Sequence, residues 1–147
     1  MNADRITIHC SATPNGIRCP ADTIRKWHVD DNGWSDIGYH MIIQPDGEVE
    51  RGRSLNRQGA HVSGDNENNI GICLIGTDKF TLHQFNSLRT NLQTICMTYG
   101  VPRWAIYMHN QFPSAIAQGK SCPNIPINLF LAWWLEVDTS VLISQTI

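Results

Sequence analysis

Segments in which every second residue is apolar, or in which apolar residues follow one another without a break, predict the strands of a β-sheet. Residues 5–10 (RITIHC) alternate in this way, and residues 104–108 predict a strand that ends just before a histidine. Residues 70–75 (IGICLI) are continuously apolar, which is typical of a strand buried on both faces. Residues 39–44 and 49–51 flank the turn sequence PDGE and predict a hairpin.

Apolar residues that recur every three or four positions predict helices between these strands. The clearest helix runs from Thr81 to Tyr99, because Thr81 and Gln84 form a capping-box pattern and Gly100 follows its end. Its predicted buried stripe consists of Leu82, Phe85, Leu88, Leu92, Ile95 and Tyr99.

Two shorter helices are expected on either side of this central part. The first begins at Pro20, which suits an initial helical turn, and ends at about Asp31, before Asn32 and Gly33. Ile24, Trp27 and His28 are predicted to lie on one face of this helix. The last helix is predicted over residues 128–135 and contains Trp133 and Trp134.

Strands separated by helices, together with one hairpin, predict an α/β fold with a central mixed, mostly parallel β-sheet flanked by helices. No repeat or linker interrupts residues 1–147, so we expect a single domain, with residues 136–147 as a C-terminal tail. Functional sites in such sheets lie at the carboxyl ends of strands. His9 and His109 both fall at predicted strand ends, and we therefore expect them at the site.

The composition is that of a soluble globular protein, with 41% hydrophobic residues, 16% charged residues and a formal net charge of −2. There is no basic run, so neither nucleic acid nor an anionic membrane is expected as the main partner. The N-terminus lacks the pattern of a signal peptide, and no apolar segment reaches the length of a membrane span. We also expect a monomer.

Five cysteines, an odd number at wide spacing, favour reduced thiols over a disulfide framework. Cys10, Cys73 and Cys96 lie in apolar runs and are expected to be buried as small hydrophobic residues. Cys122 is different, because it lies in the polar turn sequence GKSCP, where packing gives no reason for a thiol.

His9, His109 and Cys122 are candidates for a metal site. Zn²⁺ prefers nitrogen and sulfur ligands, and a catalytic zinc keeps one of four positions open for water. Cys10 is excluded as a ligand, because it faces the core with the apolar residues of its strand, whereas His9 points to the other face. The sequence has no HExxH or CxxC motif, so the spacing alone leaves alternatives open. His9 could be a hydrogen-bonded strand histidine, His109 a loop histidine and Cys122 an isolated thiol.

Seven blocks in order, HCSAT, WSDIGYH, DGEVERGR, GAH, NIGICLIG, HN and KSCP, resemble N-acetylmuramoyl-L-alanine amidases. The resemblance covers roughly residues 5–135 and is strongest to the amidase-type phage lysozymes (endolysins), which are related to peptidoglycan recognition proteins. It implies Zn²⁺ as cofactor, with His9, His109 and Cys122 as its ligands.

The resemblance also implies catalytic roles for Tyr39 and Lys120. We hypothesise that Lys120 stabilises the oxyanion, and that Tyr39 orients the water or helps to move its proton. Related amidases of the cell-wall recycling type carry a glutamate at the position of Cys73. The tyrosine–lysine arrangement of the phage enzymes therefore fits this sequence better than the recycling type does. Without the resemblance, a rim tyrosine and a solvated lysine are the simpler interpretations.

The other histidines are less informative. His61 is expected to line the substrate groove, with an exposed loop histidine as the alternative. His28 is expected to pack beside Trp27, and His40 to be structural; we assign no function to either, nor to His83. The stretch 110–119 looks longer than in the shortest phage members of the family, which suggests a loop that folds over the cleft and affects the placement of Lys120.

The implied activity is hydrolysis of the amide between N-acetylmuramic acid and L-alanine in peptidoglycan. A phage endolysin would stay in the host cytoplasm until the inner membrane is breached. Two rival functions are a module that binds peptidoglycan without cutting it, and a regulator that binds a phage RNA polymerase. No feature of the sequence reports polymerase binding.

Overall fold

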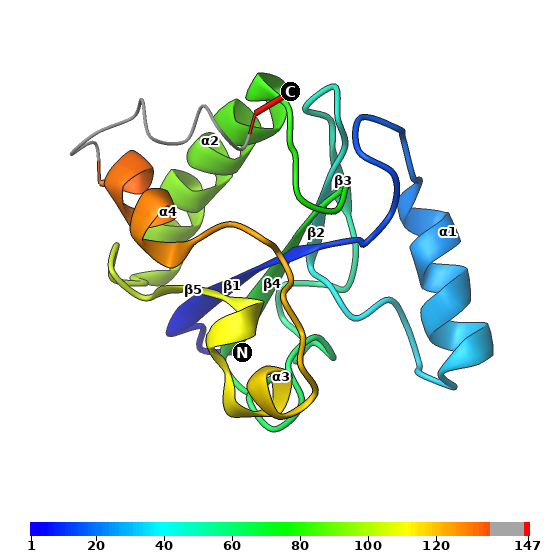
Figure 1. Ribbon diagram of the computed structural model, residues 1–147. Coiled ribbons are helices and arrows are strands. Elements are labelled where there is room, and N and C mark those ends of the chain that lie inside the picture. Colours follow the sequence, from blue (N-terminus) through cyan, green and yellow to red (C-terminus); the bar gives the residue numbers. More distant parts are fainter. Residues whose placement is uncertain (136–145) are drawn as a thin grey trace.

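The computed structural model describes residues 1–135 and 146–147, which form a single α/β domain around one five-stranded sheet (Figure 1). Across the sheet the strands follow the order β3-β2-β4-β1-β5. Their bounds are β1 (Arg5–Cys10), β2 (Met41–Ile43), β3 (Val49–Arg51), β4 (Asn69–Leu74) and β5 (Ile106–Met108).

Strand β1 has a parallel neighbour on each side. Ile8 is opposite Ile72 of β4 and Met108 of β5. Strand β2 is parallel to β4, whereas β3 is antiparallel to β2 and forms the predicted hairpin. The mixed, mostly parallel sheet expected from the sequence is therefore confirmed.

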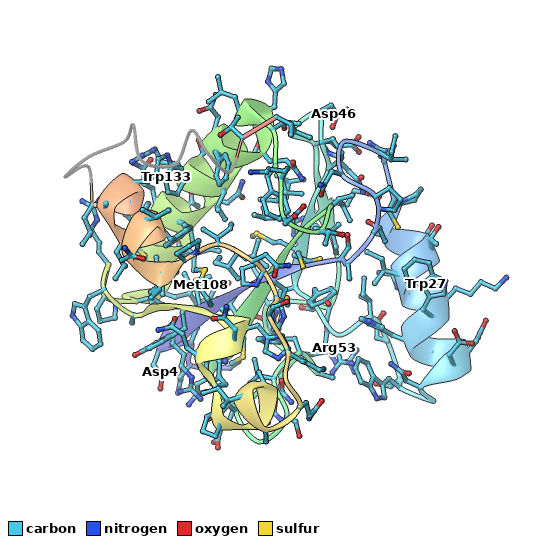
Figure 2. All side chains as sticks on the ribbon, viewed as in Figure 1. Asp4, Trp27, Asp46, Arg53, Met108 and Trp133 are labelled. Atoms are coloured by element: carbon cyan, nitrogen blue, oxygen red, sulfur yellow. The ribbon has the colours of Figure 1, made fainter. Side chains whose placement is uncertain are left out.

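Helices cover the two faces of the sheet unequally. Helices α2 (Leu82–Tyr99) and α4 (Ile127–Trp134) cover one face, and α1 (Ala21–Lys26) lies on the other side of the sheet (Figure 1). Side chains fill the space between the first face and its helices (Figure 2), and this larger core includes Ile8, Met108 and Trp133.

The face toward α1 has a smaller core, in which Ile24 packs with Ile42 and Cys73. Both sheet residues lie toward the hairpin, on β2 and β4. Since alternate residues of a strand point to opposite faces, His9 of β1 points to this second face. The part of the face around His9 is where the candidate site is built.

Helix α2 has the ends that the sequence predicts. Thr81 accepts a hydrogen bond from the backbone N–H of Gln84 at 3.1 Å, and the Gln84 side chain accepts from the N–H of Thr81 at 2.9 Å. Gly100 ends the helix with a left-handed φ of 68°. The predicted stripe is buried except at its two ends, because Leu82 is 62% exposed and Tyr99 is half-buried.

The helix predicted from Pro20 to about Asp31 is present, but its second half is a π-helical turn, η1 (Trp27–Asp31). Ile24 is buried, as expected. Trp27 and His28, which the sequence predicts to pack beside each other, have different surroundings. Trp27 is 41% exposed, whereas the ring of His28 packs against Trp34, with centroids 4.7 Å apart.

Two strands are shorter than predicted. β2 begins at Met41, so Tyr39 and His40 precede it, and β5 begins at Ile106. Trp104, which the sequence predicts to begin the strand over residues 104–108, is 68% exposed. A turn accounts for this difference, because the N–H of Ala105 donates to the carbonyl of Pro102.

The C-terminal third contains helical turns that the sequence did not reveal. Residues 110–119, expected as a loop, contain most of the 3₁₀ turn η2 (His109–Gln111) and the short helix α3 (Pro113–Ala117). Of the expected tail 136–147, only the last two residues lie within the described part, and Thr146 bridges to Phe80. Among the described residues, no helix has both the length and the apolar character required to cross a bilayer.

Candidate metal centre

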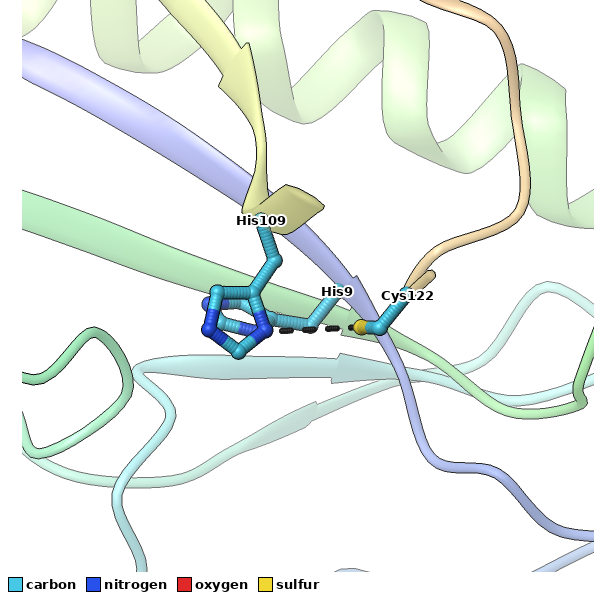
Figure 3. A group of neighbouring side chains, drawn as sticks. All are labelled: His9, His109 and Cys122. Carbon is cyan, nitrogen blue, oxygen red and sulfur yellow. Dashed lines mark hydrogen bonds between the residues drawn. The ribbon is translucent and has the colours of Figure 1, made fainter. Parts of the chain in front are cut away.

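The three candidate ligands come from three separate segments of the chain and meet at one point (Figure 3). His9 is near the end of β1, His109 directly follows β5, and Cys122 lies between α3 and α4. One potential ligand atom from each lies within 4.8 Å of the other two. The two histidines are buried and the cysteine is half-buried.

The sheet register explains how the histidines meet. Ile8 and Met108 are opposite each other in parallel strands, so the residues that follow them lie side by side. The rings of His9 and His109 accordingly lie 4.4 Å apart between centroids. The sequence placed both residues at strand ends, and the pairing of β1 with β5 makes those ends adjacent.

Backbone hydrogen bonds hold Cys122 against the two strands. The N–H of Cys10 donates to the Cys122 sulfur at 3.1 Å, and the N–H of Asn110 donates to the Cys122 carbonyl at 2.9 Å. The sulfur lies 4.0 Å from Nδ1 of His9. Cys10 itself is buried in the larger core, as predicted from its position on the strand.

Both histidines are in the chemical form that a metal requires. Burial, followed by the charges of His61, His109 and Lys120, lowers the pKa of His9 well below its ordinary value. Burial and the charge of Lys120 lower the pKa of His109 to about 4. The rings are therefore neutral near pH 7, and a neutral imidazole nitrogen can bind a metal.

This donor set suits Zn²⁺. Two imidazole nitrogens and one thiolate match its preference for nitrogen and sulfur, and three protein ligands are the number found in catalytic sites. Bonds of about 2.0–2.3 Å in a tetrahedron keep ligand atoms roughly 3.3–3.8 Å apart. In the structure the potential ligand atoms are at most 4.8 Å apart, so small side-chain rotations would bring them to these distances around an ion.

A cleft of about 490 Å³ opens beside the three residues. One wall comes from the region of α3 and includes Ser114, Ala115 and Gln118. Across the cleft, the lining includes His28 and Trp34. The segment 110–119 thus does border the cleft, although as a short helix. His28 was missed as a cleft residue, because the sequence predicted that it packs beside Trp27 on its own helix.

Tyr39 lies beside the metal centre. Its ring centroid is 5.0 Å from that of His9, and its backbone carbonyl accepts from the N–H of Arg53 at 2.8 Å. A side chain at Gly52 would collide with this carbonyl, since a Cβ there would be 2.2 Å from the oxygen. Burial, followed by the neighbouring thiols, raises the pKa of Tyr39 well above its ordinary value, so its hydroxyl keeps its proton.

Lys120 also lines the cleft, from the segment that follows α3. The side chain is exposed, and its backbone N–H donates to the carbonyl of Ala115 at 2.9 Å. Its charge contributes to the lowered pKa of both His9 and His109. The sequence predicted that Lys120 and Cys122 face the same region.

His61 lines the cleft but is only 8% exposed, so the alternative of an exposed loop histidine is wrong. Its Nδ1 lies 2.9 Å from Nε2 of His9, and its Nε2 lies 2.8 Å from the carbonyl oxygen of Asn69. Both ring nitrogens therefore have partners within the protein. Binding of substrate by His61 stays a prediction.

The remaining sequence assignments agree with the structure with one exception. His40 is buried and accepts from the N–H of Gly71 at 3.0 Å, which fits a structural role. Cys73 is fully buried. Cys96, expected to be buried, is only half-buried because it lies beside the exposed residue Met97 on α2.

Two neutral histidines that line an open cleft, together with a neighbouring cysteine, define a candidate metal-dependent enzyme. Comparison with known families makes this specific: residues 1–125 match the N-acetylmuramoyl-L-alanine amidase family. The chain belongs to this family, as its sequence motifs indicated.

Individual relatives agree with this assignment. The chain is 37% identical to the endolysin of Escherichia phage T7 over 141 residues, which cover 90% of this chain and 86% of that endolysin. It is 34% identical to peptidoglycan-recognition protein SC2 of Drosophila melanogaster over 121 residues, which cover 79% of this chain and 59% of that protein. Among solved structures, N-acetylmuramoyl-L-alanine amidase LysC from Clostridium intestinale URNW superimposes with a TM-score of 0.77 at 27% identity, covering 89% of this chain and 84% of that one.

Proposed function

We propose that this chain is a zinc-dependent amidase that hydrolyses the bond between N-acetylmuramic acid and L-alanine in peptidoglycan, as a phage endolysin. The observation that carries the proposal is the convergence of His9, His109 and Cys122, whose potential ligand atoms lie within 4.8 Å of one another, beside a cleft that the two histidines line. Family membership and the similarity to phage endolysins supply the bond and the biological setting.

His9, His109 and Cys122 would hold the metal. When bound, Zn²⁺ supplies a Lewis acid and makes a coordinated water acidic enough to react near neutral pH. The thiolate requires loss of the Cys122 proton, which an interaction with the Cys10 side chain and burial both oppose by raising the pKa of Cys122, whereas the Cys10 backbone N–H that donates to the sulfur lowers it. Binding of the metal therefore releases a proton, and we expect its affinity to fall in acid.

Lys120 compensates the charge that develops during amide hydrolysis. When water attacks the carbonyl, negative charge accumulates on the carbonyl oxygen, and a preorganised donor or cation beside that oxygen lowers the barrier. A thiolate ligand leaves the metal centre one unit less positive than a third histidine would. The ammonium group of Lys120, at the edge of the cleft, restores that charge where it is needed.

Tyr39 acts as a donor of a hydrogen bond. Its raised pKa keeps the hydroxyl protonated, so it can donate to an oxygen in the cleft, either that of the attacking water or that of the substrate carbonyl. Its position beside His9 places the ring next to the metal ligands. This role orients the reacting groups without needing the tyrosine to ionise.

The setting of the reaction follows from the proposal. As an endolysin, the protein is made in the host cytoplasm and reaches peptidoglycan after the inner membrane is breached. It acts as a monomer, with no nucleic acid and no membrane as partner. Binding of a phage RNA polymerase is not part of the proposal.

Digestion of purified sacculi tests bond, reaction and metal together. Mass spectrometry of the products should show peptides with a free L-alanine amino terminus and glycan strands that have lost their peptides. A chelator should abolish both products, and added Zn²⁺ should restore them. Binding to sacculi without release of peptides would instead favour the non-cleaving module, and cleavage of another bond would contradict the assignment.

A further inference from the structure

The strongest unexplained feature near the metal centre is a chain of hydrogen bonds that ends on a metal ligand. Nε2 of His9 lies 2.9 Å from Nδ1 of His61, and Nε2 of His61 lies 2.8 Å from the carbonyl oxygen of Asn69. All three residues are buried. His9 and His61 are 52 residues apart in sequence, so only the fold brings them together.

The carbonyl at the far end fixes the direction of the chain. A carbonyl oxygen can only accept, so the proton of His61 lies on Nε2. In the neutral ring, Nδ1 of His61 then has a free lone pair and accepts. His9 must donate from Nε2, which leaves the lone pair of its Nδ1 directed toward Cys122, whose sulfur is 4.0 Å away.

The position of the His61 ring is built into the fold. It lies flat on β4, where a Cβ at Gly71 would be 2.6 Å from the ring, and a Cβ at Gly59 would be 2.7 Å from it. The loop is held as well, because the side-chain oxygen of Asn66 accepts from the N–H groups of His61 and Val62, both at 2.8 Å. A ring held on so many sides has one orientation.

The far end of the chain is equally well held. The side chain of Asn69 is fully buried; its oxygen accepts from Thr7 at 2.8 Å, and its nitrogen donates to the carbonyl of Asp65 at 2.8 Å. Asn69 begins β4 opposite Arg5, and Cys73 of the same strand is opposite His9. The accepting carbonyl and the ligand are thus parts of the same sheet.

We propose that His61 is a positioning residue that selects the tautomer of His9, by holding its proton on Nε2 so that Nδ1 is available to the metal. This inference rests on the proposed metal centre and deepens it. A histidine ligand is held in this way in many metal sites, where a partner accepts from the nitrogen that does not bind the metal. It gives His61 a role that does not require contact with substrate.

Three substitutions of His61 separate this role from simple packing. Asparagine places an amide oxygen near the position of Nδ1, so His61→Asn keeps an acceptor for His9 but loses the bond to Asn69. Glutamine carries its amide one atom further, so His61→Gln keeps only the bond to Asn69. His61→Phe fills the slot and makes neither hydrogen bond. Zn²⁺ affinity is measured for each by competition with a chelator, with the unfolding free energy measured in parallel.

We expect His61→Gln and His61→Phe to weaken Zn²⁺ binding by roughly 10–100-fold, whereas His61→Asn stays near the wild-type value. His40→Phe is the matched control, because His40 is a buried neighbour that bonds to backbone at both nitrogens. His40→Phe should reduce the unfolding free energy but leave the affinity for Zn²⁺ near the wild-type value. Equal affinities for the three His61 variants, or the tightest binding by the phenylalanine variant, would overturn the proposal.

A measurement on the metal-free wild-type protein does not depend on any variant folding. Long-range ¹H–¹⁵N correlation spectra should show His9 protonated on Nε2 and His61 also protonated on Nε2. A proton on Nδ1 of His9 would overturn the proposal. If the wild type binds no Zn²⁺, the metal centre itself is wrong; if it binds Zn²⁺ and His61→Gln binds as tightly, only the role of His61 is wrong.

Discussion

At the scale of single residues, the site combines groups whose ordinary behaviour is altered by burial. His9 and His109 are kept neutral, and the Tyr39 hydroxyl keeps its proton. Lys120 differs from them, because it is exposed and brings a charge to the edge of the cleft. The sequence motifs indicated all four residues, but only their surroundings show which of them are neutral.

Lys120→Ala tests the role of this charge. We expect kcat to fall by about 10²–10³-fold, the effect of removing one donor from an oxyanion site, with the Zn²⁺ content unchanged. Turnover on soluble peptidoglycan fragments and metal analysis are the measurements. Lys26→Ala on the exposed side of α1 is the control and should leave kcat unaltered. Full turnover by the Lys120 variant would show that the ammonium group takes no part in the reaction.

At the scale of elements, strand pairing and helix caps place the site. The register of β1 and β5 brings two histidines together, and η2 and α3 connect His109 to the segment of Cys122. Helix α2 supports the sheet from the other face, where the side-chain amide of Gln84 donates to the carbonyls of Ile43 and Ile75. The capping box of α2 therefore also determines how the helix meets the ends of β2 and β4.

Thr81→Ala tests this cap. The substitution removes the acceptor for the N–H of Gln84 and the hydrogen bond that Thr81 donates to the carbonyl of Pro45. We expect the unfolding free energy to fall by about 1 kcal/mol, measured by urea denaturation. Thr94→Ala, at an exposed position within the same helix, should change it by less than about 0.5 kcal/mol. Equal effects of the two substitutions would mean that the cap contributes nothing specific.

At the scale of the whole molecule, the metal centre connects parts of the chain that are distant in sequence. A metal ion held by β1, the residue after β5 and the segment before α4 would bind the folded state and not the unfolded chain. Ligands of this kind stabilise a protein in proportion to the logarithm of their concentration above Kd.

We therefore expect Zn²⁺ to raise the thermal unfolding midpoint of the protein. At a free concentration of 1,000 Kd the stabilisation is about 4 kcal/mol. For a chain of this size, this corresponds to a shift of roughly 8–16 °C. Differential scanning calorimetry with Zn²⁺ and with a chelator measures it. Cys122→Ser should largely lose the dependence on Zn²⁺, whereas Cys96→Ser, on α2, should retain it. A midpoint that does not respond to Zn²⁺ in the wild type would argue against the metal centre.

The sequence by itself determined the strands, the long helix with both its caps, and the residue types of the metal centre. The strands and the helix follow from local periodicity, which neighbours in sequence are enough to reveal. The ligand set rests on the resemblance to amidases, since spacing alone left other interpretations open. The sequence did not determine that Trp27 is exposed, that residues 110–119 contain helical turns, or that His61 contacts His9. Those features depend on how loops cross the sheet and on which distant groups become neighbours. Only the tertiary structure decides them, because burial and hydrogen bonding between remote segments exist only once the chain is folded.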